Sequence, residues 1–122
     1  MFVFNHFNFN VQDLGVSKAF YEQALGLHEA RRSEAPDGRF ILLFMADEAD
    51  TPFRLELTWL RDHPQAYDLG EQEFHLCMEV EDIQAAYERH NAMGCVCQEF
   101  NGHYYFIEDP DGYWIEIVPK RS

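Results

Sequence analysis

Apolar residues along the first half of the chain follow periods that predict one helix and four strands. Aromatic and branched residues dominate residues 2–11, a composition typical of a strand. Apolar residues then recur at helical spacing between Val16 and Leu27, and Asp13 and Gly26 are placed to cap the two ends of that helix. Three further strands are predicted over residues 28–33, 40–45 and 53–59.

The second half repeats this order of elements. The tetrapeptide Val80-Glu81-Asp82-Ile83 resembles Val11-Gln12-Asp13-Leu14, which lies 69 residues earlier. Asp82 and Gly94 are placed to cap a second helix, as Asp13 and Gly26 cap the first. Strands are predicted over residues 74–80, 96–100, 103–108 and 113–118.

These elements predict an α+β fold with two βαβββ modules in one globular unit. We expect the first module to span residues 1–61, a linker to span residues 62–72 and the second module to span residues 73–122. No segment within the chain is of low complexity, so the whole length is available to these two modules.

The acidic composition of the chain narrows the classes of partner that it could bind. The 122 residues contain 22 Asp and Glu against 9 Lys and Arg, a formal net charge of −13. A balance this acidic argues against nucleic acid or an anionic membrane surface as a partner. No stretch approaches the roughly 20 apolar residues of a membrane helix, and the N-terminus lacks the pattern of a signal peptide.

Cysteine usage points to a reducing compartment. The chain has three cysteines, an odd number that cannot all pair in internal disulfides. This favours free thiols and a cytoplasmic location. Cys95 and Cys97 are separated by one residue rather than by the two of a zinc knuckle. Cys77 is expected to be a buried thiol.

Four residues stand at matching places of the two modules. Each module has a histidine on its first predicted strand and a glutamate on its last, and we expect each of them in mid-strand. A glutamate inside an apolar strand is costly to bury alone, so a shared divalent metal ion is one explanation for the set. Two histidines and two glutamates leave two positions of an octahedral shell open for water or substrate. The set comprises His6, Glu56, His75 and Glu116.

Each of the four residues also has an ordinary interpretation. A single strand histidine is commonly a hydrogen-bonded core or surface residue, and a single glutamate in an alternating strand commonly faces solvent. Surface or packing roles are expected for the remaining histidines, His28, His63, His90 and His103.

Several motifs together resemble the glyoxalase I (lactoylglutathione lyase) family of the vicinal-oxygen-chelate superfamily, in its bacterial metal-dependent type. The resemblance covers essentially the whole chain. Its motifs are Asn5-His6-Phe7, the helix end from Tyr21 to Leu27, Leu55-Glu56-Leu57-Thr58, Tyr67-Asp68-Leu69-Gly70 with His75 beyond it, and Glu108-Asp109-Pro110-Asp111-Gly112-Tyr113 followed by Glu116.

This resemblance implies a curled eight-stranded mixed sheet around one divalent metal ion, with nickel or cobalt favoured and zinc possible. The implied metal ligands are His6, Glu56, His75 and Glu116, in a protein that is usually a homodimer. The implied reaction converts the hemithioacetal of methylglyoxal and glutathione into S-lactoylglutathione through a metal-bound enediolate. Glu116 would move the proton as general base and acid, and Glu56 could assist from the opposite face.

The sequence departs from the family at two positions where contacts with the glutathione part of the substrate are expected. Asn10 stands where an arginine is usual, and Leu60 stands where an asparagine is usual. Arg54 could compensate, and so could Arg31, Arg32 or Arg39. Two alternatives therefore stay open. One is a related metalloenzyme acting on another thiol adduct, a coenzyme A ester or a catechol-like substrate, and the other is a non-catalytic protein that binds a small molecule.

Overall fold

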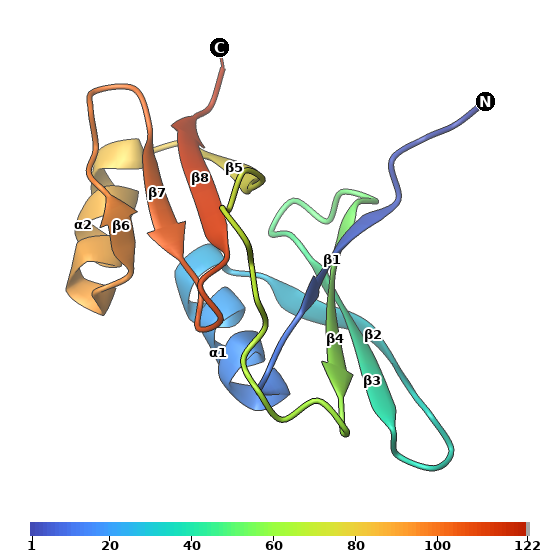
Figure 1. The fold of residues 1–122 in the computed structure, drawn as a ribbon. Helices are drawn as coiled ribbons and strands as arrows, with labels where there is room; N and C mark the ends of the chain where they lie inside the picture. The colour runs from blue at the N-terminus through green and yellow to red at the C-terminus, as the bar shows by residue number, and fades with distance from the viewer. Residues whose placement is uncertain (122) are drawn as a thin grey trace. The chain divides into compact units, whose positions relative to one another are not determined.

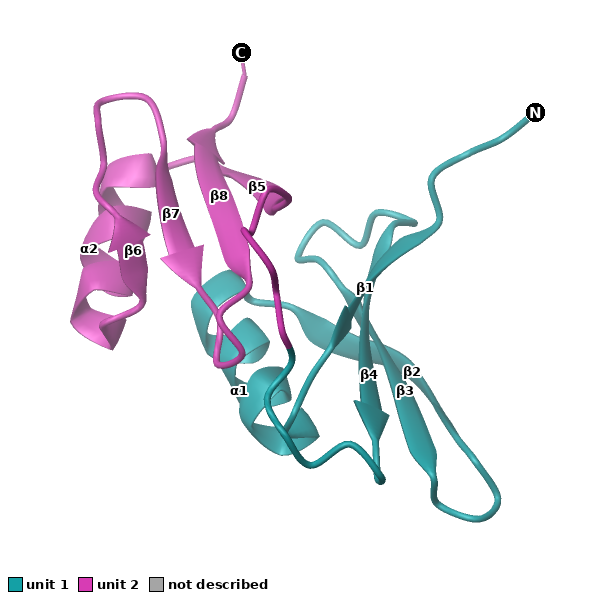
Figure 2. Ribbon diagram, viewed as in Figure 1, with its two compact units in different colours: residues 1–67 teal, residues 68–122 magenta. Residues whose placement is uncertain are grey.

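The computed structural model describes residues 1–121 and divides into two compact units, Met1–Tyr67 and Asp68–Ser122 (Figure 2). The boundary after Tyr67 falls inside the segment 62–72 that we expected to be a linker. Each unit has its own sheet and its own helix, in the order βαβββ (Figure 1). The predicted α+β class with two βαβββ modules is therefore confirmed, and each module forms a four-stranded mixed sheet.

The first unit holds its sheet in the order β1-β4-β3-β2. Strands β1 and β4 are parallel, whereas β4 with β3 and β3 with β2 are antiparallel. The helix contacts β4. The elements are β1 (His6–Asn10), α1 (Leu14–Leu25), β2 (His28–Glu34), β3 (Phe40–Ala46) and β4 (Arg54–Leu60).

The second unit repeats this arrangement in the order β5-β8-β7-β6. Again the first and fourth strands of the module are parallel and the other neighbours are antiparallel. The helix contacts β6 and β8. The elements are β5 (Leu76–Val80), α2 (Ile83–Met93), β6 (Val96–Gln98), β7 (Tyr105–Glu108) and β8 (Trp114–Pro119).

Both helices begin and end at the residues that the sequence indicated. The Asp13 carboxylate accepts a hydrogen bond from the amide of Val16, and Asp82 accepts one from the amide of Ala85. Gly26 and Gly94 follow the helices with φ of 67° and 72°, the left-handed conformation that favours glycine. No helix among residues 1–121 is long and apolar enough to cross a membrane.

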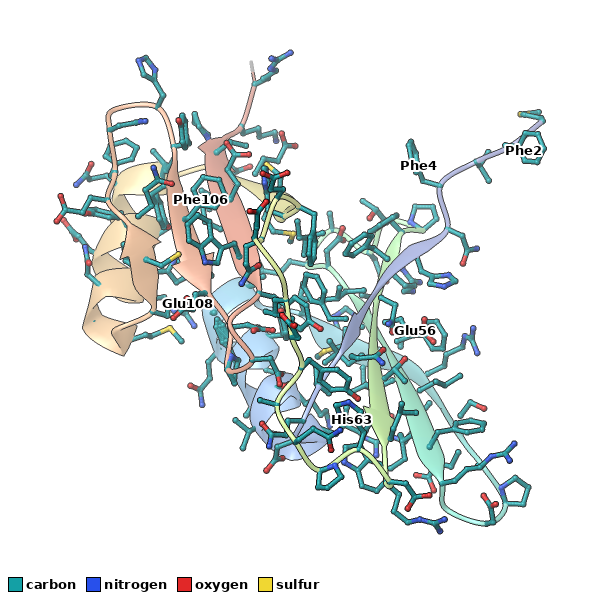
Figure 3. All side chains as sticks on the ribbon, in the orientation of Figure 1. Phe2, Phe4, Glu56, His63, Phe106 and Glu108 are labelled. Atoms are coloured by element: carbon teal, nitrogen blue, oxygen red, sulfur yellow. The ribbon has the colours of Figure 1, made fainter. Side chains whose placement is uncertain are left out.

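The first strand of each unit begins later than predicted. His6 is the first residue of β1 rather than a mid-strand residue, and His75 lies directly before β5. In the first unit the reason is where the parallel partner begins, because a strand residue needs a partner to complete its hydrogen bonds. Strand β4 begins at Arg54, opposite His6, so residues 2–4 extend beyond the ladder, and Phe2 and Phe4 stand exposed (Figure 3).

A buried polar pair lies in the core of the second unit. The imidazole of His90, on α2, lies 2.8 Å through Nδ1 from the hydroxyl of Tyr105, on β7. His90 is 3% exposed and Tyr105 is fully buried, which confirms a packing role for this histidine. Burial raises the pKa of Tyr105 well above its usual range, so the hydroxyl keeps its proton for this hydrogen bond.

Removing the Tyr105 hydroxyl should therefore destabilise the protein. We expect Tyr105→Phe to lower the free energy of unfolding by about 1–3 kcal/mol, because it leaves a buried imidazole nitrogen without this partner. Urea denaturation would measure the change. Tyr104→Phe is the matched control, since the Tyr104 hydroxyl has no hydrogen bond within residues 1–121, and it should change stability by less than about 0.5 kcal/mol. Equal stability of the two variants would contradict a stabilising hydrogen bond between Tyr105 and His90.

Candidate functional site

Strand β4 turns apolar side chains to one face of the first sheet and polar side chains to the other. Leu55 and Leu57 are buried, whereas Glu56 and Thr58 point to the opposite face because side chains alternate along a strand. Glu56 lies opposite Asn8 on β1 and opposite Phe44 on β3. These three side chains therefore form one row across the polar face.

His6 joins this row from the end of β1. Its Nε2 lies 3.4 Å from Glu56 Oε1, and its ring meets the Phe44 ring edge to face, with centroids 5.7 Å apart. The other ring nitrogen, Nδ1, lies 2.7 Å from the Asn5 side-chain oxygen. An N–H at Nδ1 that donates to Asn5 leaves the Nε2 lone pair directed at the carboxylate.

The second unit carries the same arrangement. His75 Nε2 lies 3.1 Å from Glu116 Oε1. The His75 ring meets the Phe106 ring edge to face, with centroids 5.0 Å apart. Phe106 lies opposite Glu116 in the antiparallel pairing of β7 with β8, as Phe44 lies opposite Glu56 in the first unit. Figure 3 labels Glu56 on β4 and Phe106 on β7.

A loop stabilised by its own aspartate leads into the strand that carries Glu116. Asp109 is 3% exposed, and its Oδ1 accepts hydrogen bonds from the amides of Asp111 and Tyr113, each at 2.9 Å. Gly112 has a φ of 94°, which a residue with a side chain rarely adopts. The Asp-Pro-Asp-Gly sequence therefore fixes where β8 starts and which of its residues face Phe106.

Each histidine–glutamate pair has the separation expected of two neighbouring ligands of one metal ion. Bonds of about 2.1 Å from one ion to both atoms would place the nitrogen and the oxygen roughly 3.0–3.4 Å apart, for angles between octahedral and tetrahedral. The observed separations are 3.4 Å and 3.1 Å. The Asn5 side-chain oxygen is also placed to accept a hydrogen bond from the other ring nitrogen, as the partner of a metal-ligand histidine commonly does.

Electrostatics favours a cation at both pairs. The Glu56 and Glu116 side chains are only 12% and 21% exposed. Within residues 1–121, neither carboxylate forms an ion pair with a lysine or an arginine. A largely buried carboxylate that faces an imidazole and has no lysine or arginine partner is well served by a divalent ion. In the described part of the chain, no group of three or more potential ligands is arranged to hold a metal ion, so each unit presents a pair.

Cys77 lies beside the second pair, opposite Glu116 in the sheet. Our expectation of a buried thiol is wrong, because the residue is exposed. The cause is the alternation of β5, which turns Cys77 to the face of Glu116 and away from the core. Desolvation and the neighbouring Glu116 and Glu79 carboxylates raise its pKa to about 11, so the thiol is protonated at neutral pH. Cys95 and Cys97 are also free.

The remaining histidines make separate contacts. His28 lies 3.5 Å from Asp50, His63 stacks on Tyr67 at a centroid distance of 4.0 Å, and His103 is exposed beyond β6. Sequence reasoning missed Asn5, Phe44 and Phe106. The motif Asn5-His6-Phe7 contains the first, and pairing the third and fourth strands of each module in register would have indicated the other two.

The two positions that depart from the family pattern lie on the polar face of the first sheet. Asn10 accepts a hydrogen bond of 2.7 Å from Asn8, which in turn accepts one from Thr58. Leu60 ends β4 opposite Phe40. Neither position therefore offers a positive charge to a substrate that binds at this face.

Comparison with known proteins identifies the family of this chain. The family model of the Glyoxalase/Bleomycin resistance protein/Dioxygenase superfamily matches residues 3–117. A lactoylglutathione lyase of Neisseria meningitidis is 39% identical, over 96% of this chain and 90% of the relative. A lactoylglutathione lyase of Pseudomonas aeruginosa is 35% identical, over 96% of this chain and 82% of the relative.

A solved glyoxalase I structure has the same fold as this chain. The trypanothione-dependent glyoxalase I of Leishmania major superposes with a TM-score of 0.85 at 28% identity, covering 98% of this chain and 87% of that chain. The described elements, the two histidine–glutamate pairs and these relatives lead to one conclusion. The chain belongs to the Glyoxalase/Bleomycin resistance protein/Dioxygenase superfamily and, within it, is an enzyme of the glyoxalase I (lactoylglutathione lyase) type.

Proposed function

We propose that the protein isomerises the hemithioacetal of methylglyoxal and glutathione to S-lactoylglutathione, using one divalent metal ion held by both histidine–glutamate pairs. The observation that carries the proposal is the equivalence of the two pairs, each with its nitrogen and oxygen at a chelating separation. The names of the relatives, lactoylglutathione lyases, supply the reaction. The proposed ligands are His6, Glu56, His75 and Glu116.

The donor set suits an ion with six coordination positions. Two imidazoles and two carboxylates leave two positions for the vicinal oxygens of the substrate, and the two carboxylates balance the charge of a divalent ion. Zinc prefers four ligands in structural sites, so nickel or cobalt is the better match to this set. The two pairs would come from one chain or from the two chains of a homodimer, and the same ligands apply in either case.

The chain's own groups would carry the proton. A bound divalent ion would act as a Lewis acid and stabilise the negative charge that develops on the substrate oxygens. Glu116 would take the proton from the carbon that bears sulfur and return it to the neighbouring carbonyl carbon, so that the atoms of substrate and product balance. Of the two carboxylates Glu116 is the more accessible, at 21% against 12%, which favours it over Glu56 as the base. Glu56 would assist from the other side.

A second candidate keeps the metal chemistry and changes the substrate. The net charge of −13 repels an anionic substrate at long range, and Asn10 and Leu60 add no positive charge. The missing positive charge leaves open a related reaction on another thiol adduct or a catechol-like compound. A coenzyme A ester is a further alternative, although its phosphate groups would meet the same repulsion. A non-catalytic binding protein is disfavoured, since a sequestering pocket has no need of two chelating pairs.

The proposal includes a homodimer in the cytoplasm. Strand β1 lies at the edge of its sheet, and edge strands are common places for two chains to associate. The three free cysteines fit a reducing compartment.

Glu116→Gln should abolish most of the isomerase activity. The amide keeps the size of the side chain but can neither accept the substrate proton nor supply an anionic metal ligand, so we expect kcat to fall at least about a hundredfold with nickel in excess. Formation of the thioester from methylglyoxal and glutathione, followed by ultraviolet absorbance, is the measurement. Glu108→Gln is the matched control, because Glu108 is an exposed residue at the end of β7, and it should keep full activity. Wild-type activity in Glu116→Gln, or none in the metal-loaded wild type, would refute the proposal.

Asn5→Ala should weaken metal binding without removing a ligand. The Asn5 oxygen orients the His6 ring, and loss of such a partner commonly costs about 10–100-fold in metal affinity. Competition with a chromophoric chelator would measure nickel affinity directly. Asn91→Ala, at an exposed position on α2, provides the comparison and should bind nickel as the wild type does. An unchanged affinity in Asn5→Ala would show that the contact does not support a ligand.

A further inference from the structure

Two arginines lie beside the His6–Glu56 pair on the polar face of the first sheet. Arg54 lies opposite His6 in the parallel pairing of β1 with β4. Arg31 lies opposite Phe44 in the pairing of β2 with β3, and Phe44 in turn lies opposite Glu56. Directly opposed strand residues project to the same face, so both arginines flank the proposed metal-binding pair.

Arg31 is positioned by an aromatic ring rather than by an acid. Its guanidinium carbon lies 3.9 Å from the centroid of the Phe44 ring, whose edge contact with His6 is part of the site. Stacking on a ring restricts a guanidinium while leaving its five N–H donors available. Arg31 is exposed, so a ligand at this face can reach those donors.

Arg54 is positioned by backbone oxygens. Its Nη1 donates hydrogen bonds to the carbonyl groups of Thr51 and Phe53. Both acceptors are neutral, so they orient the guanidinium without compensating its charge. The donors on Nε and Nη2 are not used by these two bonds.

The lack of an acidic partner sets these arginines apart from most basic residues of the chain. Within residues 1–121, neither Arg31 nor Arg54 has a carboxylate oxygen within 4.0 Å, although acids outnumber bases 22 to 9. Of the four arginines that sequence alone could not rank, Arg32 and Arg39 are paired with acids. The basic residues that pair with acids include Lys18, Arg32, Arg39, Arg61 and Lys120.

We propose that Arg31 and Arg54 bind the carboxylate groups of the thiol part of the substrate, and so select an anionic, carboxylate-bearing thiol adduct. The inference rests on the proposed function, because it assumes that a thiol adduct binds at the His6–Glu56 pair. Guanidinium groups bind carboxylates through paired hydrogen bonds, and the two arginines provide local positive charge on a chain that is acidic overall. They would supply the charge that Asn10 and Leu60 do not.

Direct binding tests the inference independently of turnover. The probe is S-methylglutathione, an unreactive thioether that keeps both glutathione carboxylates, titrated calorimetrically into the nickel-loaded full chain. We expect Arg31→Gln and Arg54→Gln each to weaken binding about ten- to hundredfold, as loss of a hydrogen bond to a charged group does. Arg32→Gln is the matched control, since it removes the same charge from a neighbouring residue that is paired with Glu29, and it should bind within about twofold of wild type.

Esterified ligand separates recognition from a structural role. The diethyl ester of S-methylglutathione has no carboxylates, so the wild type and both glutamine variants should bind it equally and weakly. In turnover of the hemithioacetal, the variants should raise KM with little change in kcat, and Arg31→Lys should restore part of the affinity. Equal losses for the free acid and the ester, or wild-type affinity in both variants, would overturn the inference.

The two proposals fail in different ways. A wild type that isomerises the hemithioacetal while both arginine variants bind and turn over normally would refute the arginine assignment and leave the reaction intact. A wild type that binds S-methylglutathione through these arginines but shows no turnover would refute the proposed reaction and support the arginine assignment.

Discussion

The candidate site depends on a glutamate in the middle of an apolar strand. This glutamate lies next to a histidine that stands at, or directly before, the start of the neighbouring parallel strand. Leu55 and Leu57 fix the orientation of β4 by being buried, and Glu56 must then project from the other face. The same constraint acts on Glu116 between Ile115 and Ile117. Burial of the apolar neighbours therefore holds each carboxylate next to its histidine, at a cost that a bound cation would offset.

Charge is distributed unevenly over this molecule, and the distribution bears on its chemistry. An excess of carboxylates favours solubility but opposes the approach of an anionic substrate. The face that carries His6 and Glu56 is an exception, because Arg31 and Arg54 lie there without acidic partners. Overall composition is thus a poor guide to the local potential, which depends on which few basic residues remain uncompensated.

Much of the fold could be predicted from sequence, because the informative residues act locally. Asp13, Gly26, Asp82 and Gly94 mark helix ends through contacts within a few residues, and the structure agrees at all four. The start of β1 could not be predicted from residues 2–5, since it depends on where β4 begins, far along the chain. Likewise the pairing register between strands decides which residues lie beside the histidine–glutamate pairs, and it brings Phe44, Phe106 and Arg31 there. The four candidate ligands were found because the repeat places them at equivalent positions, while their roles as ligands stay a prediction.

The number of divalent ions bound per chain tests the central claim most directly. Equilibrium dialysis of the purified protein against nickel, followed by elemental analysis, measures it without reference to any substrate. Two histidine–glutamate pairs that share an ion predict one tightly bound nickel per chain, lost when either Glu56 or Glu116 is replaced by glutamine. Two ions per chain would show that the pairs act separately, and none would show that they are only hydrogen-bonded strand residues; either result would contradict the account.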